Sequence, residues 1–160
     1  MKTPRRIVTA HDAGGLGIVA YDGPAPASHQ ISDGTVYHDI WLTAASPAPL
    51  TATEEEPMRT DVILGPPSAG TLARIVDMPP GARADMHRTE TIDYGVVLEG
   101  AVTLVLDDGS ATTAGAGDLI VQRGTRHAWE NRTGAPTRIL FVLVAARMQD
   151  ELRALLDSGG

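Results

Sequence analysis

The second half of the chain consists of short runs of β-branched and aliphatic residues separated by compact turns. Two of these turns, at Asp108-Gly109 and at residues 131–134, are strong hairpin signals. The 17 glycines and 11 prolines lie between the runs instead of in one tail, which is typical of an all-β domain. Repeated hairpins at this spacing predict a closed barrel or sandwich. The expected strands cover residues 71–78, 92–100, 101–108, 111–113, 119–122, 127–131 and 137–145.

The first 70 residues predict an arm and outer strands around this core. Residues 7–9 and 17–21 are short strand-like runs on either side of a glycine-rich turn, which indicates a hairpin. The segment that follows, 22–34, is rich in Pro, Gly, Ser and Ala, and we expect a surface loop. Residues 35–43 alternate in polarity and predict a strand, whereas residues 44–67 carry prolines and three consecutive glutamates and are expected to wrap the outside.

A length of 160 residues suits one domain, with residues 71–146 as its barrel core. Only residues 147–160 have helical spacing, and they predict one short amphipathic helix followed by a tail. Its apolar side would carry Met148, Leu152, Leu155 and Leu156.

The charge and composition narrow the partners. A formal charge of -7 repels phosphate backbones and anionic membrane surfaces, and no helix-turn-helix segment is recognisable, so nucleic acid and membranes are not expected partners. The chain has no cysteine, so any metal would have nitrogen and oxygen ligands. No apolar run approaches the roughly eighteen residues of a membrane span, and a cytoplasmic protein is the default expectation.

Four polar side chains fall on alternate residues, namely His87, Thr89, Thr91 and Asp93. An extended chain places such residues on one face. His127 begins another expected strand, and an imidazole beside His87 and Asp93 would complete a small metal or acid–base site.

These residues resemble the two sequence motifs of the cupin family. The first family motif is a glycine, His-x-His, a glutamate and a second glycine; the second runs from Gly-Asp to a histidine followed four residues later by asparagine. The resemblance covers about residues 72–145 and implies a double-stranded β-helix, the jelly-roll barrel. The matching positions here are Gly81, His87-x-Thr89, Asp93 and Gly100, then Gly117-Asp118, Gly124, His127 and Asn131.

In cupins with the full motif, three histidines and a glutamate hold a metal ion. The resemblance therefore implies His87, Asp93 and His127 as metal ligands, with Thr89 as a weak fourth donor that orients a bound water. Two imidazoles and a carboxylate could hold iron, zinc, manganese or nickel. Threonine replaces one histidine and aspartate replaces the glutamate, so the alternative is a barrel that has lost its metal and keeps both histidines hydrogen-bonded inside.

Several other residues have two readings. Glu90 could substitute as a ligand if the chain bulges, but regular alternation turns it towards solvent. His38 could reach the cavity from a neighbouring strand as a ligand-binding residue, or it could be a packed, hydrogen-bonded histidine. Trp129 shares parity with His127, so it is either a wall of the binding pocket or a core residue. Arg74 could meet an anionic substrate, although arginine on a strand is usually solvated.

Three functions follow from these readings. The first is a small metal-dependent enzyme acting on an oxygenated organic metabolite, as a dioxygenase, isomerase, dehydratase or decarboxylase, with Asp93 or His87 as the catalytic base. The second is a metal-free module that binds a small molecule through Trp129, His87 and Asp93 without chemistry. Thr89 is a further candidate ligand-binding residue. The third is an interaction scaffold with a filled cavity. The family resemblance also implies a homodimer.

Overall fold

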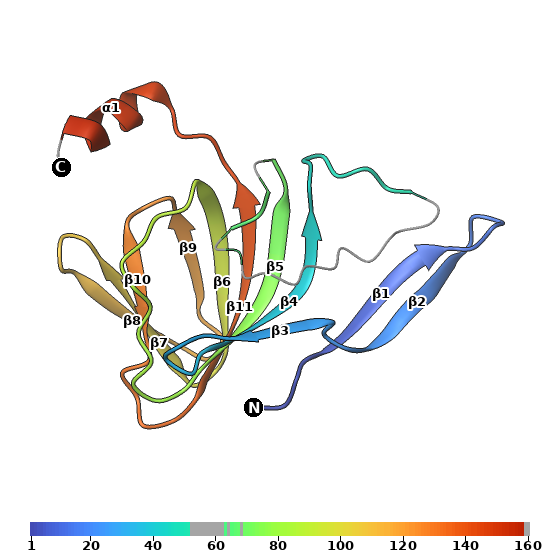
Figure 1. Ribbon diagram of the computed structural model, residues 1–160, viewed down its shortest axis with the longest axis horizontal. Helices are drawn as coiled ribbons and strands as arrows, with labels where there is room; N and C mark the ends of the chain where they lie inside the picture. Colours follow the sequence, from blue (N-terminus) through green and yellow to red (C-terminus); the bar gives the residue numbers. More distant parts are fainter. Residues whose placement is uncertain (52–62, 64, 68, 159–160) are drawn as a thin grey trace.

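The computed structural model describes residues 1–51, 63, 65–67 and 69–158. The strands form three sheets, and the two larger ones enclose the core (Figure 1). The six-stranded sheet has the order β3-β4-β5-β11-β6-β9, and the three-stranded sheet has the order β10-β7-β8. The bounds are β3 Ala27–Gln30, β4 Val36–Thr43, β5 Thr71–Met78, β6 Thr91–Glu99, β7 Ala101–Leu106, β8 Ala111–Gly115, β9 Leu119–Arg123, β10 His127–Glu130 and β11 Thr137–Ala145. This is the all-β jelly-roll barrel that the sequence predicts.

The core lies between these two sheets because β5, β6 and β11 turn alternate residues inwards. In β11 the buried positions are Thr137, Ile139, Phe141 and Leu143, while the residues between them are only partly buried. Leu72 and Val76 of β5 and Val97 of β6 pack in the same cluster. Burial of such side chains stabilises the fold by about 1.5–3 kcal/mol each.

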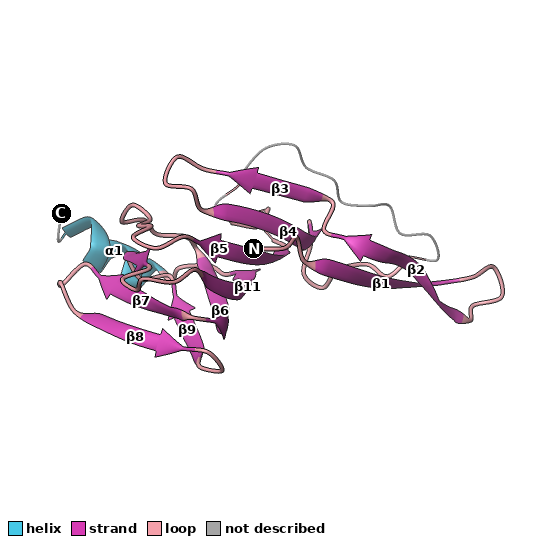
Figure 2. Ribbon diagram, turned by 90° about the horizontal axis from the view of Figure 1, so that it is seen from below, coloured by secondary structure: helices cyan, strands magenta, loops and turns pink. Residues whose placement is uncertain are grey.

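The hairpin of β1 (Arg5–His11) and β2 (Gly17–Pro24) forms the third sheet and projects away from the barrel (Figures 1 and 2). Its antiparallel pairing agrees with the expected hairpin, although both strands are longer than the sequence indicated. Ile7, Leu16 and Val19 are exposed along it.

The expected surface loop at residues 22–34 is wrong in its centre. Strand β2 continues to Pro24, and Ala27–Gln30 form β3, which pairs with β4. Because β3 is the edge of its sheet, it needs hydrogen-bond partners on one side only, and this tolerates the nearby prolines. The expected course of residues 44–67 falls largely outside the described residues.

Helix α1 (Asp150–Ser158) has no buried residue and begins three residues later than the tail predicted. It is attached to the barrel through Glu90, which accepts a hydrogen bond from the Met148 main-chain N–H (3.2 Å) and pairs with Arg153 (3.0 Å). Within the part of the chain that the structure describes, no helix is long and apolar enough to cross a membrane.

One buried side chain joins the two motif-bearing segments. Asn131, immediately after β10, donates to the main-chain carbonyls of Met78 (3.0 Å), Pro79 (3.1 Å) and Ala135 (2.8 Å). Its carbonyl accepts two hydrogen bonds from Thr133. Asn131 is 1% exposed, so it positions the segment after β5 against the turn after β10.

Candidate functional site

The two histidines of the motifs lie directly opposite each other. The main-chain N–H groups of His87 and His127 each donate to the other's carbonyl at 2.8 Å, and the ring centroids are 4.5 Å apart. His87 belongs to the segment that leads into β6, and His127 begins β10. The predicted meeting of these imidazoles is therefore present in the structure.

The orientation of His87 leaves one nitrogen available. Its Nδ1 lies 2.8 Å from the main-chain carbonyl of Asp85. A carbonyl only accepts hydrogen bonds, so Nδ1 carries the hydrogen. In the neutral ring Nε2 is then unprotonated and can accept a proton from a molecule in the cavity.

Asp93 on β6 is a buried carboxyl group with an unmet hydrogen-bonding demand. It is 5% exposed, and its Oδ1 has no hydrogen-bond partner. Burial raises the pKa of Asp93 above the ordinary value, and this outweighs the opposing effects of the Thr91 hydroxyl and of His87. A buried carboxyl group with a raised pKa in a cavity is a candidate for proton transfer.

His127 is more deeply buried than His87 and does not line the cavity. Its Nδ1 lies 2.9 Å from the Thr125 carbonyl and 2.6 Å from Nε2 of Gln122. Burial lowers the pKa of His127, against the raising effect of the Thr125 hydrogen bond, so the ring is neutral at pH 7. Its Nδ1 contacts hold it as a fixed support beside His87.

The sequence reasoning missed Gln122, which holds both His127 and the main-chain N–H of Gly124. Gln122 is the register partner of Asp93 across β9 and β6. If the expected strands at residues 92–100 and 119–122 had been paired in register, Gln122 would have been placed opposite Asp93.

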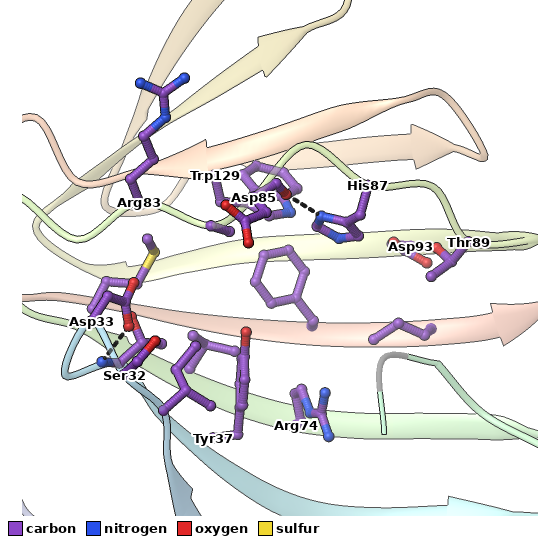
Figure 3. Close-up of a pocket in the computed structure, with 17 residues that line it drawn as sticks. Ser32, Asp33, Tyr37, Arg74, Arg83, Asp85, His87, Thr89, Asp93 and Trp129 are labelled. Atoms are coloured by element: carbon purple, nitrogen blue, oxygen red, sulfur yellow. Dashed lines mark hydrogen bonds between the residues drawn. The ribbon is translucent and has the colours of Figure 1, made fainter. Parts of the chain in front are cut away.

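His87, Thr89 and Asp93 line a cavity of about 370 Å³ inside the barrel. Figure 3 shows His87, Thr89 and Asp93 at one end of it and Ser32 and Asp33 at the other. Trp129 and Phe141 form part of the apolar wall, with ring centroids 5.1 Å apart. Trp129 therefore has both of its expected roles, since it packs in the core and lines the pocket.

The residues do not fit the metal centre that the motif resemblance implies. Among the described residues, no group of three or more His, Asp or Glu side chains is placed to hold a metal ion. The Thr89 hydroxyl is hydrogen-bonded to that of Thr91 at 2.7 Å. Glu90 faces the helix and pairs with Arg153, so it does not supply a replacement ligand.

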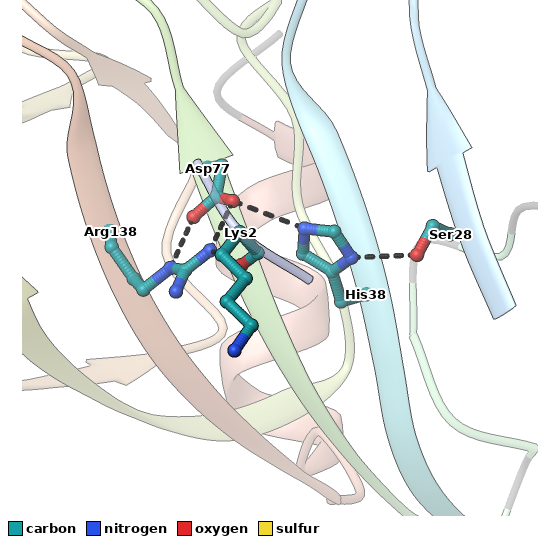
Figure 4. A network of polar contacts seen from close by, with 5 residues as sticks. All are labelled: Lys2, Ser28, His38, Asp77 and Arg138. Carbon is teal, nitrogen blue, oxygen red and sulfur yellow. Dashed lines mark hydrogen bonds and ion pairs between the residues drawn. The ribbon is translucent and has the colours of Figure 1, made fainter. Parts of the chain in front are cut away.

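His38 does not lie in the cavity, which corrects its expected ligand-binding role. Tyr37 points into the cavity, so alternation along β4 turns His38 to the opposite face of the sheet. There its Nδ1 contacts the Ser28 hydroxyl at 2.7 Å and its Nε2 contacts Asp77 at 3.1 Å (Figure 4). Arg138 also pairs with Asp77 (2.6 Å), so His38 is a packed member of a polar network.

Arg74 is the reverse case, because it lines the cavity and is buried, whereas solvation was the usual expectation beside a contact with an anionic substrate. It is 4% exposed and donates to Asp39 (2.9 and 2.7 Å) and to the Ile63 carbonyl (2.8 Å). Its guanidinium lies over the Tyr37 ring, 4.7 Å from the centroid. Its parity with the buried Leu72 in β5 was the available signal.

Comparison with known proteins agrees with this architecture. A family model described as a cupin domain matches residues 74–143. Phomopsin biosynthesis cluster protein C' of Diaporthe leptostromiformis is 40% identical over 153 residues, which cover 92% of this chain and 81% of that protein. Oryzines biosynthesis cluster protein J of Aspergillus oryzae is 30% identical over 148 residues, covering 89% and 83%. The cupin-domain-containing oxidoreductase fogC of Aspergillus ruber is 46% identical over 78 residues, covering 47% and 38%.

Two solved structures share the fold at low sequence identity. The Cnp3 cupin domain of Schizosaccharomyces pombe has a TM-score of 0.56 at 13% identity, over 99% of this chain and 97% of that one. A putative ethanolamine utilization protein of Salmonella typhimurium has a TM-score of 0.53 at 14% identity, over 92% and 100%. With the motifs, the barrel and the 40% identical relative, these matches establish that the chain belongs to the cupin superfamily.

Proposed function

We propose that this protein is a small cupin enzyme that uses Asp93 and His87 as an acid–base pair on an oxygenated organic metabolite. The observation that carries the proposal is the unpartnered Oδ1 of Asp93, buried in a cavity that His87 also lines. The names of the relatives, biosynthesis cluster proteins and oxidoreductases, support a role in small-molecule metabolism.

The residues favour isomerisation or dehydration among the reactions considered from the sequence. In dehydration, His87 Nε2 takes a proton from a carbon next to a carbonyl group. The electron pair left on that carbon forms a carbon–carbon double bond as the hydroxyl leaves from the neighbouring carbon. Protonated Asp93 gives its proton to that hydroxyl, which departs as water. His127, neutral and buried, keeps the His87 segment in place.

Metal-dependent oxygenation is less well supported, because among the described residues no group of three or more His, Asp or Glu side chains is placed to hold a metal ion. Thr89, the expected weak fourth donor, and Glu90, the possible substitute ligand, are engaged elsewhere.

The test is a screen of β-hydroxy ketones for water loss, followed by the absorbance of the conjugated product. Protein purified without added metal and then treated with a chelator is compared with Asp93→Asn and His87→Gln. Asp108→Asn, in an exposed turn, is the matched control. We expect chelated parent and control to be equally active, with each site variant reduced about 100-fold or more.

Loss of activity on chelation with recovery on adding one metal equivalent would refute the proposal. So would an Asp93→Asn variant with parental activity. Elemental analysis of the parent and of His127→Ala gives a direct check, since the metal-dependent alternative predicts about one equivalent per chain in the parent alone.

A metal-free binding module is the second candidate, favoured by the aromatic walls around the cavity. It predicts that a ligand binds and is recovered unchanged, with no product formed by parent or variants.

A further inference from the structure

The walls of the cavity are aromatic on several sides. Trp129 and Phe141 are 8% and 7% exposed and pack against each other at an interplanar angle of 57°. Tyr37 lines the cavity from β4, and the His87 ring lines it from the segment before β6. Ring faces and edges pack best on a flat ring, so these walls suit an aromatic body. The volume of about 370 Å³ is near the lower end of the 300–1,000 Å³ typical of ligand pockets.

The charges around the cavity disfavour an anion. Both arginines that line it already have carboxylate partners: Arg74 is paired with Asp39, and Arg83 with Glu130 at 3.0 Å. The carboxyl groups of Asp33, Asp85 and Asp93 also line the cavity. A carboxylate or phosphate group on the ligand would meet these acidic groups, and among the described residues that line the cavity both arginines are already paired with carboxylates.

At the end of the cavity lined by His87 and Asp93, two acceptor atoms lack a hydrogen-bond donor. Asp93 Oδ1 has no partner, and His87 Nε2 is unprotonated in the neutral ring because Nδ1 donates to Asp85. A ligand that offers an O–H group would satisfy this end. An ammonium group could also donate, but its burial among apolar walls costs far more than that of a hydroxyl.

We propose that the cavity selects a neutral aromatic alcohol, with the ring between Trp129, Phe141 and Tyr37 and the hydroxyl on Asp93. This inference rests on the proposed function in that the same cavity holds the reacting molecule. It adds the class of substrate. The hydroxyl next to Asp93 is also the group that a dehydrating acid would protonate.

The test compares four probes of nearly one size, namely benzyl alcohol, toluene, benzoate and benzylamine, by protein-observed NMR titration at pH 7. We expect benzyl alcohol to bind about tenfold more tightly than toluene or benzylamine, and benzoate to be the weakest. In Asp93→Leu the preference for the alcohol over toluene should disappear, while the Asp108→Asn control keeps it. Circular dichroism and thermal denaturation show whether each variant is folded.

Tightest binding of benzoate or benzylamine by the parent would overturn the inference, and that result needs no variant. An alcohol preference that survives in folded Asp93→Leu would also overturn it. Binding is read without turnover, so an intact preference in a protein that dehydrates nothing would refute only the catalytic proposal. Turnover of non-aromatic substrates without any alcohol preference would refute only this one.

Discussion

Replacing Asp93 with asparagine should make the protein more stable while it removes the proposed activity. Asp93 is buried, and its Oδ1 accepts no hydrogen bond in the structure. Asparagine has nearly the same shape and carries no charge, so the substitution removes the cost of a desolvated carboxylate without opening a cavity.

The size of the gain follows from that unmet hydrogen bond. A buried polar group without a partner costs about 1–3 kcal/mol, and the amide of asparagine keeps part of that cost. We therefore expect the free energy of unfolding to rise by about 1 kcal/mol once the pH lies above the raised pKa of Asp93. For a domain of this size, that corresponds to an increase in Tm of about 2–4 °C.

The stability gain of Asp93→Asn should depend on pH, in a direction set by the pKa shift of Asp93. Burial raises the pKa of Asp93 in the folded state, so the folded protein holds this proton more tightly than the unfolded chain. Below the ordinary pKa both states are protonated and the cost is absent. The cost grows as the pH rises from the ordinary pKa to the raised one, and it is constant above that range.

Urea denaturation of parent and Asp93→Asn at intervals between pH 3 and 8 measures the effect. The stability gain should be small at the acidic end and should grow as the pH rises through the raised pKa of Asp93. The control Asp108→Asn should behave in the opposite way, since hydrogen bonds from Ser110 lower the pKa of Asp108. An Asp93→Asn variant that is less stable than the parent at pH 7, or a gain that does not vary with pH, would refute the reasoning.

Three further predictions concern the scaffold. Asn131→Ala should lower the free energy of unfolding by about 2–4 kcal/mol in urea denaturation, because it removes the three hydrogen bonds that the buried Asn131 amide donates to main-chain carbonyls. Burial alone would raise the pKa of Asp77, but hydrogen bonds from Arg138 and His38 lower it below its ordinary value. The ion pair between Asp77 and Arg138 therefore stabilises the fold above the ordinary pKa, and this stabilisation is lost as the pH falls through the lowered pKa. Arg138→Met should therefore destabilise most at neutral pH, by about 3 kcal/mol, and little at pH 3 in thermal denaturation. The homodimer that the family resemblance implies remains a proposal; if it uses the exposed apolar pair Tyr94 and Val121, Val121→Asp should elute as a monomer in size-exclusion chromatography beside a dimeric parent.

The sequence predicted the barrel well because its signals are local. Alternation in residues 137–145 and the hairpin signal at Asp108-Gly109 correspond to β11 and to the turn between β7 and β8. Strand β3 was missed because an edge strand needs no apolar alternation of its own. The burial of Arg74 was missed because its partner Asp39 lies 35 residues away in another strand.

For the site, the sequence predicted that the two motif histidines lie close together, but it could not predict whether the side chains are placed to bind a metal. Register and motif spacing indicate that His87 and His127 meet, and their rings are 4.5 Å apart. Metal binding requires donor atoms placed to within a few tenths of an ångström, and that depends on side-chain rotation. The local sequence does not indicate that the Thr89 side chain bonds to Thr91, or that the Glu90 side chain pairs with Arg153.

Asp93 differs from the other buried carboxylates of the described residues in its lack of an ion-pair partner. Among the described residues, the remaining buried acidic groups each pair with an arginine: Asp39 with Arg74, Asp77 with Arg138, and Glu130 with Arg132. Asp93 alone in this set has no arginine partner, and it faces the cavity. A carboxylate that supported only the fold would be better replaced by an uncharged residue, since its burial costs free energy without an ion pair in return. The cost is understandable if a bound molecule supplies the missing hydrogen-bond donor, and this supports the proposal that Asp93 takes part in the reaction.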